Sequence, residues 1–190
     1  LYRDRARAAD ILARFTFRNE TLAAAMSDLS NPALNPGSNM DNWLTSFNKV
    51  VGQPGLTPYI VAHENDKLPL FDRIAAPARD SIQSRYRVTV IMSCFRPDRA
   101  LLTAVASVLN QTWINLELII VDDNSGSAYA SLLDQVEASD DRIMMIRKTE
   151  NGGTYTARNT ALRVATGDFC TVVDSDDYVH PEFIERSIQP

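Results

Sequence analysis

The feature that most constrains the fold is an alternation of strand-like and helix-like segments that begins near Tyr86. Short runs of β-branched and apolar residues alternate with segments in which apolar residues recur at helical spacing. Such alternation is typical of a mostly parallel sheet with right-handed helical crossovers, because parallel neighbours need a long connection. The sequence therefore predicts a Rossmann-like α/β domain over residues 86–190, with strands over 87–92, 116–121, 143–146 and 169–173.

Capping signals place the helices of this region. Asp98 is expected to open the first crossover helix. Gly167 is expected to end the third, since glycine is common just after a helix. Pro181 is expected in the first turn of a final helix, where its missing N–H costs nothing.

Residues 1–85 have a different pattern, which predicts a mainly helical, partly irregular N-terminal extension. Helices are expected over residues 2–15 and after Asn19, and a third is expected to begin with Asp41 as its N-cap. Prolines interrupt the segment after this third helix, at Pro54, Pro58, Pro69 and Pro77. The pattern assigns no function to this extension.

Composition narrows the class of protein. The net charge of −5 argues against a nucleic-acid-binding protein, which would carry a basic patch. No apolar stretch reaches the length of a membrane span, and the sequence shows no secretory signal pattern. The chain begins at Leu1 and not at Met, which fits either a piece of a longer protein or a changed numbering. Cys94 and Cys170 are expected to be buried free thiols, which fits a cytoplasmic location.

Polar and acidic residues follow three of the four predicted strands. Ser93 and its neighbours follow the first strand, Asp122 and Asp123 follow the second, and an acidic run over residues 174–177 follows the fourth. In open α/β sheets, ligands bind beyond the carboxyl ends of the strands, where the strand order reverses. We therefore expect these three segments to converge on one edge of the sheet.

The acidic run over residues 174–177 is a candidate metal site. Neighbouring carboxylates repel one another unless they are solvated, protonated or bound to a cation. Oxygen ligands of this kind suit Mg²⁺ or Mn²⁺, and magnesium sites often complete their coordination with substrate phosphates. Asp176 is the candidate metal ligand, and Asp174 is a second ligand or positions a ribose hydroxyl. The alternative for this run is a solvated acidic loop.

Other residues near the same edge have both a functional and a structural interpretation. Asp122 and Asp123 could accept hydrogen bonds from a base or a ribose, or could simply form a turn. Phe95 could stack on a nucleobase or could belong to the core. Arg158, near the start of a helix, suits a phosphate group or lies on a solvated helix face.

The order of these segments along the chain strongly resembles the opening of family 2 glycosyltransferases. The segments that carry the resemblance are 88–93, 107–112, 117–125, 141–143, 151–153, 157–159, 165–168 and 174–177. The resemblance covers residues 86–190. It implies the N-terminal, donor-binding half of a GT-A fold, which is incomplete here. It also implies a nucleotide-diphosphate sugar as donor, most commonly a UDP-sugar, and inversion at the anomeric carbon.

The resemblance further implies roles for individual residues. It places Ser93 and Phe95 in a nucleoside pocket and Asp123 against the base. It identifies Asp174 and Asp176 as the acids of an Asp-x-Asp motif that binds Mn²⁺ or Mg²⁺. Phe95 replaces the tyrosine of many members, so stacking is expected to remain while a hydroxyl contact is lost. The candidates for nucleotide-sugar binding are Ser93, Phe95, Arg96, Asp122, Asp123, Arg158, Asp174 and Ser175, and those for the metal are Asp174 and Asp176.

Family members carry an acceptor-binding half and a catalytic base well after the Asp-x-Asp motif, and this chain stops at Pro190. We therefore assign no catalytic residue and expect the chain alone to bind donor without efficient transfer. The acceptor would be a glycan or a lipid-linked molecule, the latter at the inner face of a membrane. The alternative function is a truncated or degenerate nucleotide-sugar-binding module without catalytic activity.

Two other classes of protein fit the sequence less well. A sugar nucleotidyltransferase would have a glycine-rich loop after the first strand, whereas residues 93–98 contain no glycine. A receiver-type signalling module would have a phospho-acceptor aspartate after the third strand, where Arg147 and Lys148 stand. The sequence therefore favours the transferase.

Overall fold

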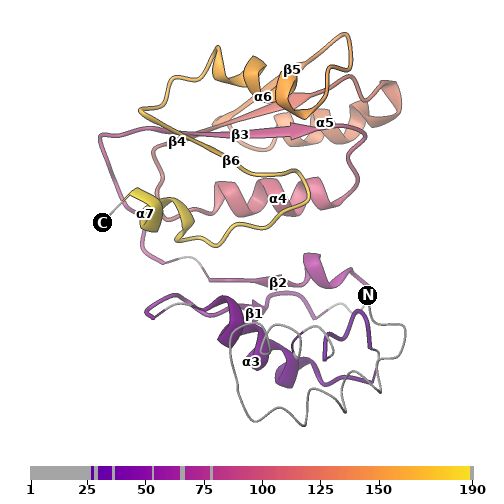
Figure 1. Cartoon of the computed structure of the whole chain (residues 1–190), viewed down its shortest axis with the longest axis vertical. Helices are drawn as coiled ribbons and strands as arrows, with labels where there is room; N and C mark the ends of the chain where they lie inside the picture. The colour runs from indigo at the N-terminus through magenta and orange to yellow at the C-terminus, as the bar shows by residue number, and fades with distance from the viewer. Residues whose placement is uncertain are drawn as a thin grey trace. The chain divides into compact units, whose positions relative to one another are not determined.

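The computed structural model describes residues 27, 30–35, 37–52, 54–64, 67–77 and 79–188. The chain divides into two compact units, unit 1 (residues 1–77) and unit 2 (residues 78–190), which are described separately (Figure 1). The helices expected over residues 2–15 and after Asn19 lie outside the described residues. Of the helices in the described ranges, none has the length and apolar character needed to cross a membrane.

The described part of unit 1 contains a helix and a pair of short antiparallel strands. These elements are helix α3 (Met40–Val51), strand β1 (Ile60–Val61), the 3-10 helix η1 (Leu70–Asp72) and strand β2 (Ile74–Ala75), which pairs with β1. The N-cap of α3 is Asn39 and not Asp41 as expected, because Asn39 Oδ1 accepts a hydrogen bond from Asn42 N at 2.9 Å. Asp41 lies in the first turn instead, where its charge complements the helix dipole.

Unit 1 has a small aromatic cluster of its own. Trp43 is buried, and its ring stacks on that of Phe47 with the centroids 5.0 Å apart. Phe47 in turn meets Tyr59 edge-on, at 5.4 Å between centroids. The Asn48 side chain donates to Tyr59 O and accepts from Tyr59 N, both at 2.8 Å. These contacts attach α3 to the segment that leads into β1.

Unit 2 is built on a four-stranded sheet whose neighbouring strands are all parallel. The strands are β3 (Val88–Cys94), β4 (Leu116–Asp122), β5 (Ile143–Arg147) and β6 (Phe169–Val172). Their spatial order is β5-β4-β3-β6, so the chain adds strands in one direction from β3 and then returns to its other side. This arrangement confirms the predicted α/β fold with a parallel sheet, and the strand order reverses between β3 and β6.

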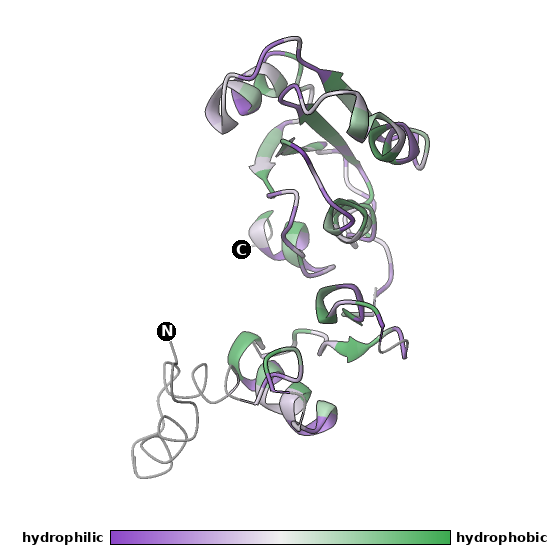
Figure 2. Ribbon diagram, turned by 90° about the vertical axis from the view of Figure 1, so that its right-hand side faces the viewer, coloured by the Kyte–Doolittle hydropathy of each residue, from purple (hydrophilic) through white to green (hydrophobic). Residues whose placement is uncertain are grey.

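Helices cover both faces of this sheet (Figure 1). They are α4 (Ala100–Leu109), α5 (Ala130–Glu137), which the 3-10 helix η2 (Ser127–Tyr129) precedes, α6 (Thr154–Leu162) and α7 (Phe183–Ile188). Val90 and Met92 of β3 point to the face covered by α4, α5 and α7. Ile91 points to the opposite face, against Ala157 and Ala161 of α6. Because both faces are covered, the central strands β3 and β4 are mostly apolar (Figure 2), with Thr89 and Glu117 as buried polar exceptions.

Three local expectations are wrong. Helix α6 ends several residues before Gly167. A Cβ on Gly167 would lie 2.5 Å from Thr89 N, so the glycine instead lets the loop before β6 approach β3 closely. Pro181 precedes α7 rather than lying in its first turn. Cys170 is exposed because β6 lies at the edge of the sheet, whereas Cys94 is buried as expected.

Candidate functional site

Two adjoining cavities lie at the carboxyl edge of the sheet. The smaller cavity, of about 170 Å³, lies where the strand order reverses between β3 and β6, the place where ligands bind in open α/β sheets. Its lining residues follow these two strands: Phe95, Arg96, Pro97, Asp98, Ser175 and Asp176. The larger cavity, of about 220 Å³, is lined by Ser93, Cys94, Phe95, Asp123, Asn151, Gly153 and Thr154. Phe95 lines both cavities, so the three polar segments predicted from the sequence lie around one edge.

The segment after β3 leaves the sheet through a strained turn. Arg96 has a φ of 51°, in the left-handed region that non-glycine residues rarely adopt. Its backbone N donates to Ser125 Oγ at 2.7 Å, which ties this turn to the loop after β4. Phe95 is 47% exposed, so it is not a core residue, and the Arg96 guanidinium lies over its ring at 4.9 Å. The Phe95 ring is therefore accessible at the junction of the two cavities.

Asp122 holds the turn after β4. Its buried Oδ1 accepts a hydrogen bond from Ser125 N at 3.0 Å and a short one from Ser125 Oγ. Asn124, between them, has a φ of 63°, which this turn requires. Asp122 lines neither cavity, and its contacts with Ser125 stabilise the turn.

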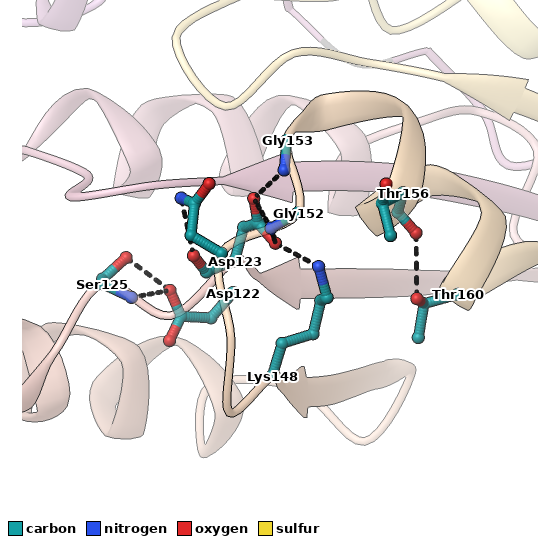
Figure 3. A network of polar contacts seen from close by, with 9 residues as sticks. Asp122, Asp123, Ser125, Lys148, Gly152, Gly153, Thr156 and Thr160 are labelled. Carbon is teal, nitrogen blue, oxygen red and sulfur yellow. Dashed lines mark hydrogen bonds and ion pairs between the residues drawn. The ribbon is translucent and has the colours of Figure 1, made fainter.

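Asp123 is the centre of a network that joins the ends of β4 and β5 to the start of α6 (Figure 3). Its carboxylate is 4% exposed and forms a short ion pair with Lys148 Nζ. The same carboxylate accepts from Gly152 N at 3.0 Å and from Gly153 N at 2.6 Å. Asn151 Nδ2 donates to the backbone oxygen of Asp123 at 3.0 Å. The loop before α6 is thus wrapped around one buried carboxylate.

The surroundings of this network keep Asp123 charged and Cys94 neutral. Burial alone would raise the pKa of Asp123, but hydrogen bonds from Lys148, Gly152 and Gly153 and the charge of Lys148 hold it below its usual value. Burial, followed by the charges of Asp122 and Asp123, raises the pKa of the Cys94 thiol to about 12. Cys94 is therefore a protonated lining residue at neutral pH and not a nucleophile.

Asp174 and Arg158 form an ion pair, and neither residue lines a cavity, although Asp174 directly precedes Ser175, which lines the smaller one. Arg158, on α6, donates from Nη2 to Asp174 Oδ1 at 2.5 Å. The Asp174 side chain is 53% exposed and that of Arg158 is 24% exposed. Arg158 Nε is buried and has no hydrogen-bond partner among the described residues. This unused N–H group can donate a hydrogen bond to a further anionic partner.

The acidic run after β6 gathers several negative charges. Burial, and then the negative charges of Asp174 and Asp176, raise the pKa of Asp177 above its usual value. Among the described residues, no three His, Cys, Asp or Glu side chains are arranged to hold a metal ion. Asp174 and Asp176 therefore offer at most part of a coordination shell.

Several lining residues were missed in the sequence. Asn151, Gly153 and Thr154 line the larger cavity, and Lys148 pairs with Asp123, but none was a candidate site residue. Lys148 directly follows β5, so the strand-end rule that selected Asp123 would have selected it as well.

Comparison with known proteins gives a consistent result for unit 2. A protein-family model described as "Glycosyl transferase family 2" matches residues 89–190. Glycosyltransferase GlyG of Streptococcus pneumoniae serotype 4 is 32% identical over 102 residues, which are 54% of this chain and 34% of GlyG. WfgD of Escherichia coli is 37% identical over 92 residues, which are 48% of this chain and 36% of WfgD.

The full name of WfgD describes a UDP-Glc:alpha-D-GlcNAc-diphosphoundecaprenol beta-1,3-glucosyltransferase. This chain spans about a third of the length of GlyG and of WfgD. Among solved structures, S. aureus TarS in complex with UDP-GlcNAc is 25% identical, with a TM-score of 0.48, over 53% of this chain and 30% of the TarS chain.

Proposed function

The chain belongs to glycosyl transferase family 2, and on this premise we propose that its residues 86–190 bind the nucleotide-diphosphate sugar donor of a GT-A glycosyltransferase. The observation that carries the proposal is the pair of adjoining cavities at the carboxyl edge of the sheet, the smaller of which lies at the switch point. Residues that follow different strands line the two cavities. Two adjoining cavities of this kind suit a ligand that has a base at one end and phosphates at the other.

The larger cavity is proposed to hold the nucleoside. Phe95 supplies an accessible aromatic ring at its mouth, and Ser93 and Asp123 supply polar groups along its wall. The Asp123 carboxylate already accepts from Lys148, Gly152 and Gly153, so its main contribution is to shape this wall. The UDP-Glc in the name of the relative WfgD supports a UDP-sugar as the proposed donor.

The smaller cavity is proposed to hold the diphosphate and a divalent cation. Magnesium sites commonly use one or two carboxylates and complete the shell with substrate phosphates, so Asp174 and Asp176 suffice as protein ligands. The unused Nε of Arg158 lies beside Asp174 and suits a phosphate oxygen, while Ser175 and Arg96 complete the polar rim. A cation bound there would offset charge on the leaving diphosphate.

Sugar transfer is proposed for the whole protein, since this chain spans about a third of the relatives that it matches. The proposed reaction is attack of an acceptor hydroxyl on the anomeric carbon with inversion. A glycan, or a lipid-linked sugar like that in the name of WfgD, is the proposed acceptor. A lipid-linked acceptor would bring the protein to the inner face of a membrane.

Calorimetric titration with UDP, with and without Mn²⁺, tests the donor site. Wild-type protein is expected to bind UDP more tightly with Mn²⁺, and Asp176→Asn is expected to lose this enhancement. Asp141→Asn is the matched control, because Asp141 is exposed and precedes β5 at the opposite edge of the sheet. The proposal would be contradicted if the intact protein did not bind UDP. It would also be contradicted if the affinity for UDP changed neither with Mn²⁺ nor with Asp176→Asn.

A further inference from the structure

We propose that Lys148 is a positioning residue of the nucleoside pocket, acting through Asp123 to hold the loop of residues 151–154 in place. This inference rests on the proposed function, because it assumes that the larger cavity holds the nucleoside. Lys148 itself does not line that cavity, whereas Asp123, Asn151 and Thr154 do. Its effect on a ligand therefore has to pass through the residues that it holds.

The ion pair of Lys148 and Asp123 is well shielded from solvent. The Lys148 side chain is 16% exposed and that of Asp123 is 4% exposed. Lys148 N also donates to Asp122 O at 2.9 Å, which anchors the lysine backbone to the end of β4. Removal of one partner from such a pair leaves an uncompensated buried charge, which is strongly unfavourable.

The loop before α6 packs directly on this pair. A Cβ on Gly152 would lie 2.8 Å from Lys148 Nζ and 2.9 Å from Thr156 Cγ2, so the glycine backbone lies against the ammonium group. Gly153 has a φ of 81°, and its N–H points at the Asp123 carboxylate (Figure 3). Lys148 therefore fixes both the carboxylate and the backbone that closes over it.

The same contacts limit what Asp123 offers to a ligand. A carboxylate has about four lone-pair positions. Lys148, Gly152 and Gly153 already donate to this one, with Gly152 N shared between both oxygens. Little acceptor capacity remains for a base, so most of the contribution of Asp123 to the pocket is to shape its wall. Without Lys148, this wall would lose the charge that holds it.

The neighbouring residue provides a matched control. Arg147 is the last residue of β5 and directly precedes Lys148 in the chain. Arg147 pairs with Asp134 and Glu137 of α5, all of them well exposed. Arg147→Met removes the same charge from the same strand end without touching the pocket.

The test is a double-mutant cycle on the full chain, with UDP affinity measured with and without Mn²⁺. Lys148→Met is expected to raise the Kd for UDP by at least about tenfold, by the same factor in both conditions, while Arg147→Met leaves it unchanged. In an Asp123→Asn background, Lys148→Met is expected to have little further effect. Wild-type affinity of Lys148→Met, or an undiminished effect in that background, would overturn the inference.

Amide hydrogen exchange provides a readout that needs no ligand. Gly152 and Gly153 amides are expected to exchange slowly in wild type and in Arg147→Met, and much faster in Lys148→Met. Unchanged protection in a folded Lys148→Met protein would also overturn the inference. If wild type fails to bind UDP, the proposed function fails, and the exchange rates still decide whether Lys148 holds the loop.

Discussion

At the scale of single residues, the carboxylates of the site divide into two kinds. Asp122 and Asp123 are buried and already engaged by donors from the chain itself. Asp174 and Asp176 are exposed, and Asp174 has one ion pair, with Arg158. We therefore assign the first pair to the scaffold of the pocket, and we propose the second pair as the contact for a cation and a phosphate. Two pairs of aspartates near the ends of strands thus differ in burial and in their partners.

Replacement of Phe95 tests the proposed stacking contact. Phe95→Leu is expected to weaken UDP binding by about 1–3 kcal/mol, the usual value of a base stacked on an aromatic ring. Phe95→Tyr keeps the ring and is expected to bind like wild type. Titration calorimetry measures both, and equal affinities of the leucine and tyrosine variants would exclude stacking. Because Phe95 is exposed, neither variant is expected to lose stability.

The lowered pKa of Asp123 predicts a pH dependence of folding stability. A carboxyl whose pKa is lower in the folded state stabilises the fold above its unfolded pKa, and this contribution disappears as the pH falls through the folded value. Asp123→Asn is therefore expected to be less stable than wild type at pH 7, with a difference that shrinks below its ordinary pKa of 3.8. Urea unfolding from pH 7 to pH 3 measures this difference. A constant gap over that range would contradict the assignment.

The strand-end rule located Phe95, Asp123 and Asp176 from the sequence because each directly follows a recognisable apolar strand or its turn. It did not reveal that Asp123 is occupied by Lys148. That contact depends on β4 and β5 being neighbours in the sheet, which the order of the residues along the chain does not show.

At the scale of elements, the four strands of unit 2 were predicted to within a few residues. Strands covered on both faces are mostly apolar, and polar residues gather where they leave the sheet. The two-residue strands β1 and β2 were missed, because so short a segment has no measurable periodicity. Gly167 was misassigned since a glycine that permits close packing looks, in sequence, like one that ends a helix.

Glu117 connects three elements and is expected to matter for stability. On β4, it accepts from Thr89 Oγ1 of β3 at 2.6 Å and from Thr166 N of the loop before β6 at 2.7 Å. Glu117→Ala would leave the buried Thr89 hydroxyl without this acceptor and would release Thr166, so we expect a loss of about 2–4 kcal/mol in the free energy of unfolding. Urea denaturation measures it.

Glu137→Ala is the control for Glu117→Ala, because Glu137 is exposed and makes a surface ion pair with Arg147. Such pairs contribute about 0–1 kcal/mol, so the control is expected to stay close to wild type. Similar losses in the free energy of unfolding for the two variants would show that the contacts of Glu117 contribute no more to stability than a surface ion pair.

At the scale of the whole molecule, every candidate site residue lies in unit 2. Its boundary precedes the predicted domain start, because Ile82 pairs with Trp113 and Ile82 N donates to Thr112 O at 2.6 Å. Both hydrophobic clusters of the sheet are formed within this unit. We therefore propose that residues 78–190 are the donor-binding domain and that residues 1–77 form a separate extension.

Removal of residues 1–77 tests this division. The remaining polypeptide is expected to fold and to bind UDP with an affinity within about threefold of the full chain, a change of less than 1 kcal/mol. Circular dichroism and calorimetry check the two expectations. A folded polypeptide that has lost UDP binding would show that the extension contributes to the site.

The most direct test of the donor site is a crystal structure of the full chain grown with UDP and Mn²⁺. The base is expected in the larger cavity against Phe95, with the diphosphate and the ion beside Asp174 and Asp176. Electron density for UDP at any other place, or an ion held away from both aspartates, would contradict the account.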